Sequence, residues 1–328
     1  SVPPATEPKK LYGPALKPQA EYAKGQSPAD ALKSMQLPTG FKAELIAAEP
    51  DVVQPIAFTF DERGRIWVVE GNSYPQPREV GKGQDRIKIL EDKDGDGSFE
   101  TKKIFCEGLN LVSGIELGFG GVWVGAAPYL MFIPDKDHDD RADPSDASDK
   151  SDLSGKGFPQ VPGLSFKAYA LLDGWGTQDT HETLNSFIWG PDGWLYGCHG
   201  VFTHSRVGKP GTPDDQREPI NAGVWRYHPV RHEFEVFAHG TSNPWGLDYD
   251  QHGEWFVTAC VIPHLYHIVP GGRYHRQAGQ HFNAYTYEDI KTIADHAHYA
   301  GNPRPDVTFD KTTGAGVMNN DTNALGGG

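Results

Sequence analysis

The sequence predicts an all-β protein, a β-propeller made of four-stranded antiparallel blades. Two observations predict this class, and a run of unrelated sandwiches is the alternative. With 39 Gly and 26 Pro among 328 residues, turn formers are too frequent for a helix bundle or a coiled coil. One phrase, an apolar strand followed by a glycine turn and an aromatic-rich strand, recurs four times, and such repeats are typical of propellers.

The chain is expected to begin with an extended leader over residues 1–40, because this segment starts rich in Pro and Lys and lacks a hydrophobic period. Within the leader, SPADALKSMQ predicts a short helix with Ser27 as its N-cap. A second helical pattern covers residues 287–300. Helices are therefore predicted only at the two ends of the sequence.

Four predicted hairpins follow the leader, and each turns at a glycine. These glycines, Gly64, Gly121, Gly193 and Gly253, are 57, 72 and 60 residues apart, which is enough for four short strands with loops. The hairpins read PIAFTFDERGRIWVVE, SGIELGFGGVWVGA, NSFIWGPDGWLYGCHG and PWGLDYDQHGEWFVTAC. A third strand is predicted after each hairpin, as RIKILED, YLMFIPD, VWRYHPV and HLYHIVP.

The repeats divide the rest of the chain into four predicted blades. Their approximate ranges are 41–110, 111–175, 176–240 and 241–328. Residues 144–165, rich in Ser, Asp, Gly and Pro, are predicted to form a long loop between the second and third blades. Because four blades are the low end of the range at which a propeller closes, we expect an incomplete ring with further blades beyond Gly328.

Charge and composition exclude several classes of partner. The net charge of −14 and the lack of a Lys/Arg cluster exclude nucleic acid and anionic membranes. The longest uncharged stretch, 117–134, is interrupted by Gly and Pro and is too short for a membrane span. Three Cys without CxxC or CxxCH encode neither a zinc knuckle nor a covalent haem. No signal peptide is visible, so we expect one that has already been removed.

Two acidic loops have the spacing of calcium ligands. The first contains Asp92, Asp94, Asp96 and Glu100, and the second contains Asp135, Asp137, Asp139 and Asp143 at the same place in the next blade. Alternate carboxylates can converge on a hard cation, although Lys103 at the twelfth position excludes an EF-hand. In the second loop Asp140 occupies the position where Gly is expected. The sequence predicts structural calcium; solvated acidic turns are the alternative.

Histidines are concentrated in the later blades, since all but one of the 14 lie at or after His181. His181 precedes the third hairpin and His199 ends its second strand, so an imidazole there could take a proton from a substrate hydroxyl. A structural role is the alternative for both. His264 and His267 could bind a metal only if a turn brings them to one side, since strand residues three apart face opposite ways.

Several phrases resemble a known family. At HETLNSFIWGPDGWLY, AHGTSNPWGLDYD and PGGRYHRQ the chain resembles the soluble glucose/sorbosone dehydrogenase-like quinoproteins. It looks still closer to the planctomycete and verrucomicrobial family described as membrane-bound dehydrogenases. In those proteins such a propeller usually precedes helical repeats and a c-type cytochrome domain with CxxCH. The resemblance runs from about Leu37 to the end of the sequence.

The resemblance implies roles for five residues. His181 matches the base that removes the sugar's hydroxyl proton, with one residue more before GPD than in the family pattern. Where the family has HRNPxG this chain reads HGTSNPWG, so Asn243 matches, whereas Ser242 replaces the Arg that serves the pyrroloquinoline quinone. The backbone around Asn243, Pro244 and Gly246 would hold the calcium that bridges protein and quinone.

Taken with the resemblance, the sequence is interpreted as a secreted or periplasmic quinoprotein-like dehydrogenase module. It would oxidise a sugar or a related alcohol and pass electrons to a cytochrome-type domain or partner, since haem c is not encoded in this chain. Two alternatives remain: a non-catalytic carbohydrate-binding or scaffolding propeller, and a metal-dependent lyase or hydrolase that uses the histidine-rich rim.

Overall fold

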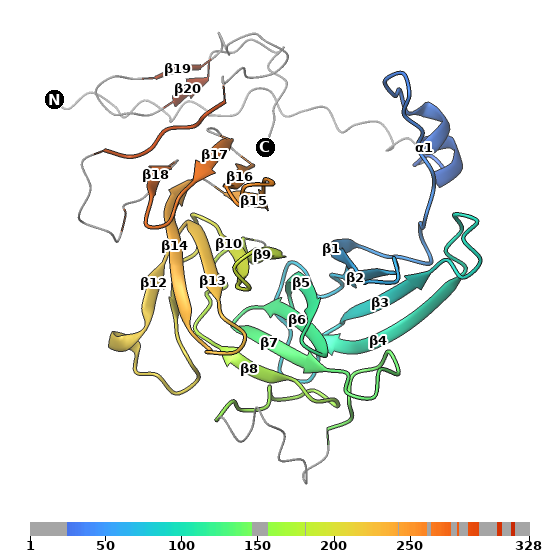
Figure 1. Cartoon of the computed structure of the whole chain (residues 1–328), viewed down its shortest axis with the longest axis horizontal. Helices are drawn as coiled ribbons and strands as arrows, with labels where there is room; N and C mark the ends of the chain where they lie inside the picture. Colours follow the sequence, from blue (N-terminus) through green and yellow to red (C-terminus); the bar gives the residue numbers. More distant parts are fainter. Residues whose placement is uncertain are drawn as a thin grey trace, which may run out of the picture. The chain divides into compact units, whose positions relative to one another are not determined.

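The computed structural model describes residues 25–145, 157–180, 182–241, 243–260, 264–276, 281, 288–294, 307–309 and 316–318. The chain forms two compact units, one of residues Ile46–His296 and one of the two chain ends (Figure 1). Among the described residues, no helix is long and apolar enough to cross a membrane.

The described residues of the unit of the chain ends form one helix and one hairpin. Helix α1 spans Pro28–Ser34, and the Ser27 side chain accepts a hydrogen bond from the Asp30 amide, which confirms Ser27 as the N-cap. Strands β19 (Val307–Phe309) and β20 (Gly316–Met318) pair antiparallel. The predicted second helix is wrong over residues 288–294, the described part of 287–300, where Ile290 forms a β-bridge with Tyr274.

The unit 46–296 contains four antiparallel blades, which confirms the predicted all-β propeller class (Figure 1). Blade 1 consists of β1 (Pro55–Phe60), β2 (Ile66–Glu70), β3 (Asp85–Glu91) and β4 (Thr101–Leu109). Blade 2 consists of β5 (Val112–Gly118), β6 (Gly121–Ala126), β7 (Tyr129–Pro134) and β8 (Tyr169–Leu172). In both blades each strand pairs with the next in sequence.

Blades 3 and 4 depart from this simple order. Blade 3 consists of β9 (Thr183–Trp189), β10 (Leu195–His199), β13 (Gly223–Tyr227) and β14 (Phe234–Thr241), with a hairpin inserted as β11 (Ser205–Val207) and β12 (Glu218–Ile220). A short 3₁₀ helix, Asp214–Gln216, lies in that insertion. Blade 4 consists of β15 (Pro244–Tyr249), β16 (Trp255–Ala259) and β17 (Leu265–Ile268). The next strand, β18 (Arg273–Arg276), pairs parallel with β14 of blade 3.

Alternation along each strand supplies a hydrophobic core between every two successive blades. Val122 and Val124 of β6 pack in one cluster with Trp67 of blade 1, whereas Trp123 between them packs in the next cluster with Trp225 of blade 3. A third cluster joins blades 3 and 4. The first strands of the blades also contact in succession, β1 with β5, β5 with β9 and β9 with β15. These strands are therefore the inner strands of the propeller.

The strand order defines two ends of the blades. We call the end at which the inner strands begin the leading end, and the end at which they turn into the second strands the hairpin end. The third strands end and the fourth strands begin at the hairpin end, because antiparallel strands alternate in direction, so the connections 92–100 and 135–168 start and finish there. Residues 144–165 lie inside this second connection, so their prediction as a link between blades is wrong: YALL, residues 169–172, supplies the fourth strand of blade 2.

Candidate functional site

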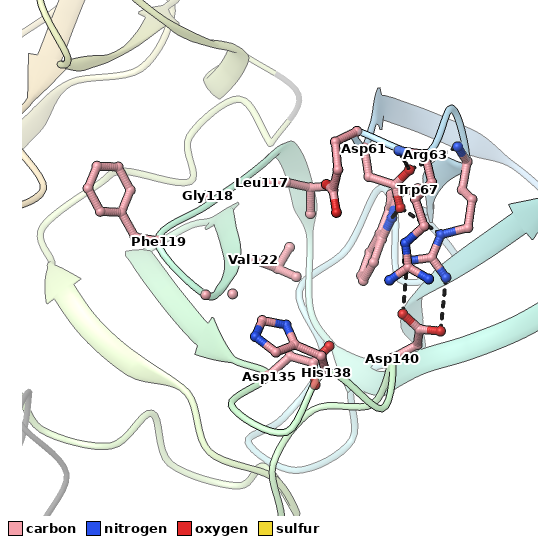
Figure 2. A pocket seen from close by; sticks show the side chains of 14 residues that line it. Asp61, Arg63, Trp67, Leu117, Gly118, Phe119, Val122, Asp135, His138 and Asp140 are labelled. Atoms are coloured by element: carbon pink, nitrogen blue, oxygen red, sulfur yellow. Dashed lines mark hydrogen bonds and ion pairs between the residues drawn. The ribbon is translucent and has the colours of Figure 1, made fainter.

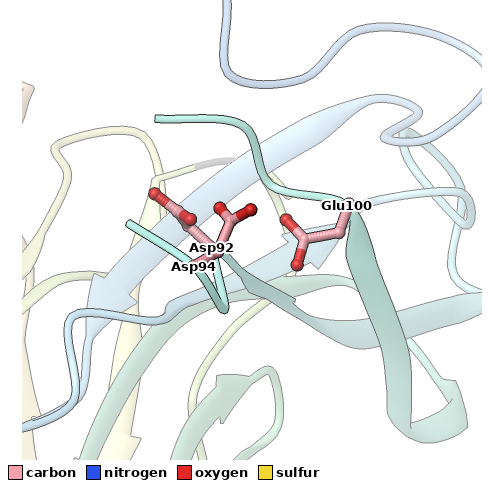
Figure 3. Close-up of side chains that lie close together, drawn as sticks. All are labelled: Asp92, Asp94 and Glu100. Carbon is pink, nitrogen blue, oxygen red and sulfur yellow. The ribbon is translucent and has the colours of Figure 1, made fainter. Parts of the chain in front are cut away.

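The first acidic loop joins β3 and β4 at the hairpin end. One carboxylate oxygen each of Asp92, Asp94 and Glu100 lies within 4.8 Å of the others (Figure 3). Asp96 is not in this group, and its Oδ1 accepts a hydrogen bond of 2.7 Å from the Ser98 amide. Amide donors, first that of Gly97, hold the pKa of Asp92 below its usual value. The loop therefore presents three convergent carboxylates.

The second acidic loop, between β7 and β8, repeats this arrangement with Asp135, Asp137 and Asp143. The two loops also share a closing hydrogen bond: the Lys93 amide donates to Glu100 at 3.2 Å, and the Lys136 amide donates to Asp143 at 3.3 Å. Asp139 occupies the place of Asp96 and likewise accepts from an amide, that of Arg141. Burial raises the pKa of Asp135.

Asp140 takes the left-handed conformation that Gly97 takes in the first loop. The φ angle is 93° at Gly97 and 63° at Asp140. The Asp140 carboxylate accepts two hydrogen bonds of 2.9 Å from Arg65, which lies after the β1–β2 turn of blade 1. Arg65, Asp135, His138 and Asp140 all line a cavity of about 290 Å³ at the hairpin end (Figure 2). The ion pair between Arg65 of blade 1 and Asp140 of blade 2 thus supports the second acidic loop, which has an aspartate where the first loop has a glycine.

Two residues with predicted functional roles, His181 and Ser242, lie outside the described residues. The neighbours of His181 are described. The Thr180 hydroxyl donates to the Pro75 carbonyl at 3.1 Å, and the buried Glu182 carboxylate accepts from the Phe202 amide at 2.7 Å. The chain before β9 is therefore held on both sides of residue 181.

Asn243, Pro244 and Gly246 lie at the start of the inner strand of blade 4, and two of them are engaged within the protein. Asn243 Oδ1 accepts a hydrogen bond of 3.0 Å from the Val201 amide. The Gly246 amide donates to Ser186 Oγ at 2.8 Å, and a Cβ at Gly246 would lie 2.4 Å from Thr258 Oγ1. The described groups thus fix β15 to the neighbouring blade.

A pocket of about 160 Å³ lies at the leading end between blades 1 and 2, and Thr180 is in its wall. We call it the leading pocket. Its other lining residues include Tyr74 and Ser113, together with Gln54 and Leu111, which precede the inner strands β1 and β5. Gln54 and Leu111 have φ angles of 47° and 53°, a strained conformation that is concentrated at ligand sites. The sequence analysis missed both residues because no residue type signals this conformation.

His199 and the HxxH pair have local partners. His199 is fully buried, its ring nitrogens lie 2.8 Å from the Gly200 carbonyl and 2.7 Å from Ser205 Oγ, and burial lowers its pKa to about 4. These contacts therefore favour a structural role for His199 over a role as a base. His267 pairs with Glu254 at 2.7 Å. Within the described part of the chain, the two acidic loops are the only groups of three or more His, Cys, Asp or Glu placed to hold a metal.

Comparison with solved structures gives matches of low identity. The PQQ-bound form of aldose sugar dehydrogenase from Streptomyces coelicolor matches with 15% identity and a TM-score of 0.43, over 73% of this chain and 67% of that chain. The holo form of the pyranose dehydrogenase PQQ domain from Coprinopsis cinerea matches with 12% identity and a TM-score of 0.42, over 75% of this chain and 50% of that chain. No curated protein matches the sequence.

Comparison with protein families gives a match over most of the chain. The model of a domain of unknown function, DUF7133, covers residues 27–148 and 165–326, which include all four blades. This chain therefore belongs to the DUF7133 family.

Proposed function

We propose that this propeller is the substrate-binding module of a quinoprotein-like dehydrogenase that acts on a sugar or a related alcohol. The observation that carries the proposal is the place of the leading pocket, whose wall includes Thr180, the residue before His181. Its lining includes the polar residues Tyr74, Thr180 and Gln54 beside the aliphatic residues Ile56 and Leu111. A few polar groups on an apolar wall suit a polyol ligand.

The role proposed for His181 is general base. A neutral imidazole can accept the proton of a substrate hydroxyl while the carbon that bears this hydroxyl is oxidised. The usual imidazole pKa near 6.5 suits this role. The proposal also includes a cytochrome-type partner and a periplasmic or extracellular location, both of which follow from the sequence resemblance.

The described residues do not by themselves fit a quinone with carboxylates. Among the residues that the structure describes, neither Lys nor Arg lines the leading pocket. The Asn243 and Gly246 groups named above are hydrogen-bonded to Val201 and Ser186. We therefore assign to this chain the binding of the alcohol and the removal of its proton, and no step of the electron transfer.

The test is a titration with calcium and pyrroloquinoline quinone, followed by thermal shift and dye reduction over a panel of sugars and alcohols. His181→Ala should abolish dye reduction and leave the melting temperature unchanged. His252→Ala, at an exposed turn of blade 4, is the matched control and should change neither. Full turnover in His181→Ala would remove His181 from the mechanism.

A second candidate is a non-catalytic carbohydrate-binding propeller, which is favoured because the described part of the leading pocket wall contains neither Lys nor Arg. Saturable sugar binding without quinone binding or dye reduction would support this function. Dye reduction would exclude it.

We also propose that the two acidic loops bind structural calcium, since both lie at the hairpin end, away from the leading pocket. Calcium should raise the melting temperature, and a chelator should lower it. Asp94→Asn and Asp137→Asn should each reduce the calcium effect, whereas Asp215→Asn, at an exposed site without a neighbouring acidic loop, should not. If neither calcium nor the chelator changes the melting temperature, the loops are acidic turns without bound calcium.

A further inference from the structure

Arg276 is a buried cation at the end of β18, and only 9% of the residue is exposed. Its guanidinium donates two hydrogen bonds to one residue, Asn221, which directly follows β12. One goes to the Asn221 carbonyl at 2.7 Å, and the other goes to Asn221 Oδ1. Hydrogen bonds from a charged donor are stronger than those between neutral groups. Arg276 therefore fixes both the position and the amide orientation of Asn221.

Asn221 in turn holds the loop of residues 200–204, which joins β10 to β11 at the leading end. Its Nδ2 donates to the carbonyls of Val201 and Thr203, both at 2.6 Å. Because the Asn221 oxygen accepts from Arg276, the amide presents its two N–H groups to the loop. All four residues are buried, so water cannot easily replace a lost partner.

The loop 200–204 contacts both segments to which the sequence assigns site residues. On one side, the Phe202 amide donates to the carboxylate of Glu182, the residue after 181, at 2.7 Å. On the other side, the Val201 amide donates to Asn243 Oδ1 at 3.0 Å. Two successive residues of one loop therefore tie the segment of residue 181 to the segment of residue 243.

We infer that Arg276 is a positioning residue for the proposed reaction, and that it acts through Asn221 on the loop 200–204. This loop holds the segments that carry His181 and Asn243 at a fixed spacing. The inference rests on the proposed function, in which His181 is the base. Arg276 itself touches no reacting atom, so its effect on the reaction is indirect.

Three replacements break the chain of contacts at different links. Arg276→Met keeps the apolar stem and removes both bonds to Asn221. Arg276→Lys keeps one charged donor and should restore part of the function. Asn221→Asp keeps both acceptors for Arg276 but replaces the donor to the loop carbonyls by an acceptor, so it breaks only the second link.

Hydrogen exchange of the intact protein tests the contacts without substrate or cofactor. In Arg276→Met and Asn221→Asp the amides of residues 201 and 202 should exchange at least about tenfold faster, because their loop is no longer held. Arg65→Met is the matched control, because Arg65 is also buried but bonds to Asp61 and Asp140 at the hairpin end. This control should leave the exchange of the loop unchanged.

Dye reduction in the presence of calcium and pyrroloquinoline quinone tests the effect on the reaction. We expect kcat to fall at least about tenfold in Arg276→Met and in Asn221→Asp, because a small displacement of a catalytic group is costly. KM should stay within about threefold, since no contact with the substrate is removed. Arg276→Lys should recover part of kcat, and Arg65→Met should keep it.

The outcomes separate the inference from the proposed function. Unchanged exchange of the loop in Arg276→Met would overturn the chain of contacts, and an unchanged kcat would overturn its role in the reaction. A rise in KM at constant kcat would also overturn that role, because it would make Arg276 a binding residue. If the unmodified protein neither binds a sugar nor reduces the dye, the proposed function and the role of Arg276 in it fail together. The exchange rates then still decide whether Arg276 holds the loop.

Discussion

Arg65 joins blade 1 to the second acidic loop, and its removal should cost more stability than that of any ordinary surface cation. Its Nε lies 2.7 Å from Asp61 Oδ2, and its two Nη atoms lie 2.9 Å from the Asp140 carboxylate. The side chains of Arg65 and Asp61 are only 6% and 4% exposed, and that of Asp140 is 19% exposed. All three charges are thus largely shielded from water.

The replacement Arg65→Met keeps the apolar stem and leaves two carboxylates without their guanidinium. Removing one partner of a buried ion pair typically costs about 3–5 kcal/mol. Asp61 keeps hydrogen bonds from Trp67 Nε1 at 3.1 Å and from the amides of residues 63 and 65 at 3.0 and 2.9 Å. Asp140 keeps the contact with Lys103 Nζ at 3.4 Å. We therefore expect the low end of that range, a loss of about 3 kcal/mol in the free energy of unfolding.

Urea denaturation followed by tryptophan fluorescence measures this loss. Arg63→Met is the matched control, because Arg63 lies in the same turn, is exposed and should change stability by less than about 0.5 kcal/mol. A loss below about 1 kcal/mol in Arg65→Met would refute the reasoning, since it would show that water or Lys103 compensates the two carboxylates.

The same pair sets an acid dependence. Burial raises the pKa of Asp61, but hydrogen bonds from Trp67 and Arg65 outweigh this effect and hold the pKa below 3.8. The Arg65 hydrogen bonds lower the pKa of Asp140 as well. Both groups therefore stabilise the fold above pH 3.8, and that stabilisation is lost as the pH falls through their lower folded-state values. Arg65→Met should flatten this part of the stability curve.

Two further predictions concern the chain beside residue 181. Because the pKa of His199 is lowered to about 4, its stabilising contribution is present above pH 6.5 and should disappear, by up to about 3 kcal/mol, as the pH falls toward 4. Urea denaturation at pH 7 and 4.5 should show a smaller difference in stability for His199→Gln than for the unmodified protein. An equal difference would assign the pH dependence to other groups. In Gly200→Ala, a Cβ would lie 2.5 Å from Glu182 Cβ, so we expect urea denaturation to show a loss of about 1–3 kcal/mol in the free energy of unfolding. Gly25→Ala is the control, because a Cβ there would have nothing within 4 Å. Equal stability of the two variants would show that the Glu182 chain can move.

Much of the fold could be predicted from local signals. The hairpins around Gly64, Gly121, Gly193 and Gly253 and the third strands that follow them lie where the alternation and turn residues indicate. The two acidic loops gather their first, third and ninth residues, whereas the fifth residue of each loop, which the spacing also predicted as a ligand, lies outside the group. A strand, a tight turn and a short ligand loop depend on neighbouring residues, so a sequence pattern can specify them.

Only the tertiary structure decided the features that join distant residues. The left-handed Asp140 depends on Arg65, 75 residues earlier, because an ion pair between blades replaces the freedom of a glycine. The leading pocket combines residues near 54, 74, 111 and 180, which no single stretch of sequence brings together. The burial of His199 depends on the packing of β10 within blade 3, although its residue type alone would suit a base. Strand formation is local along the chain, whereas pockets and pKa shifts arise where separate blades pack and exclude water.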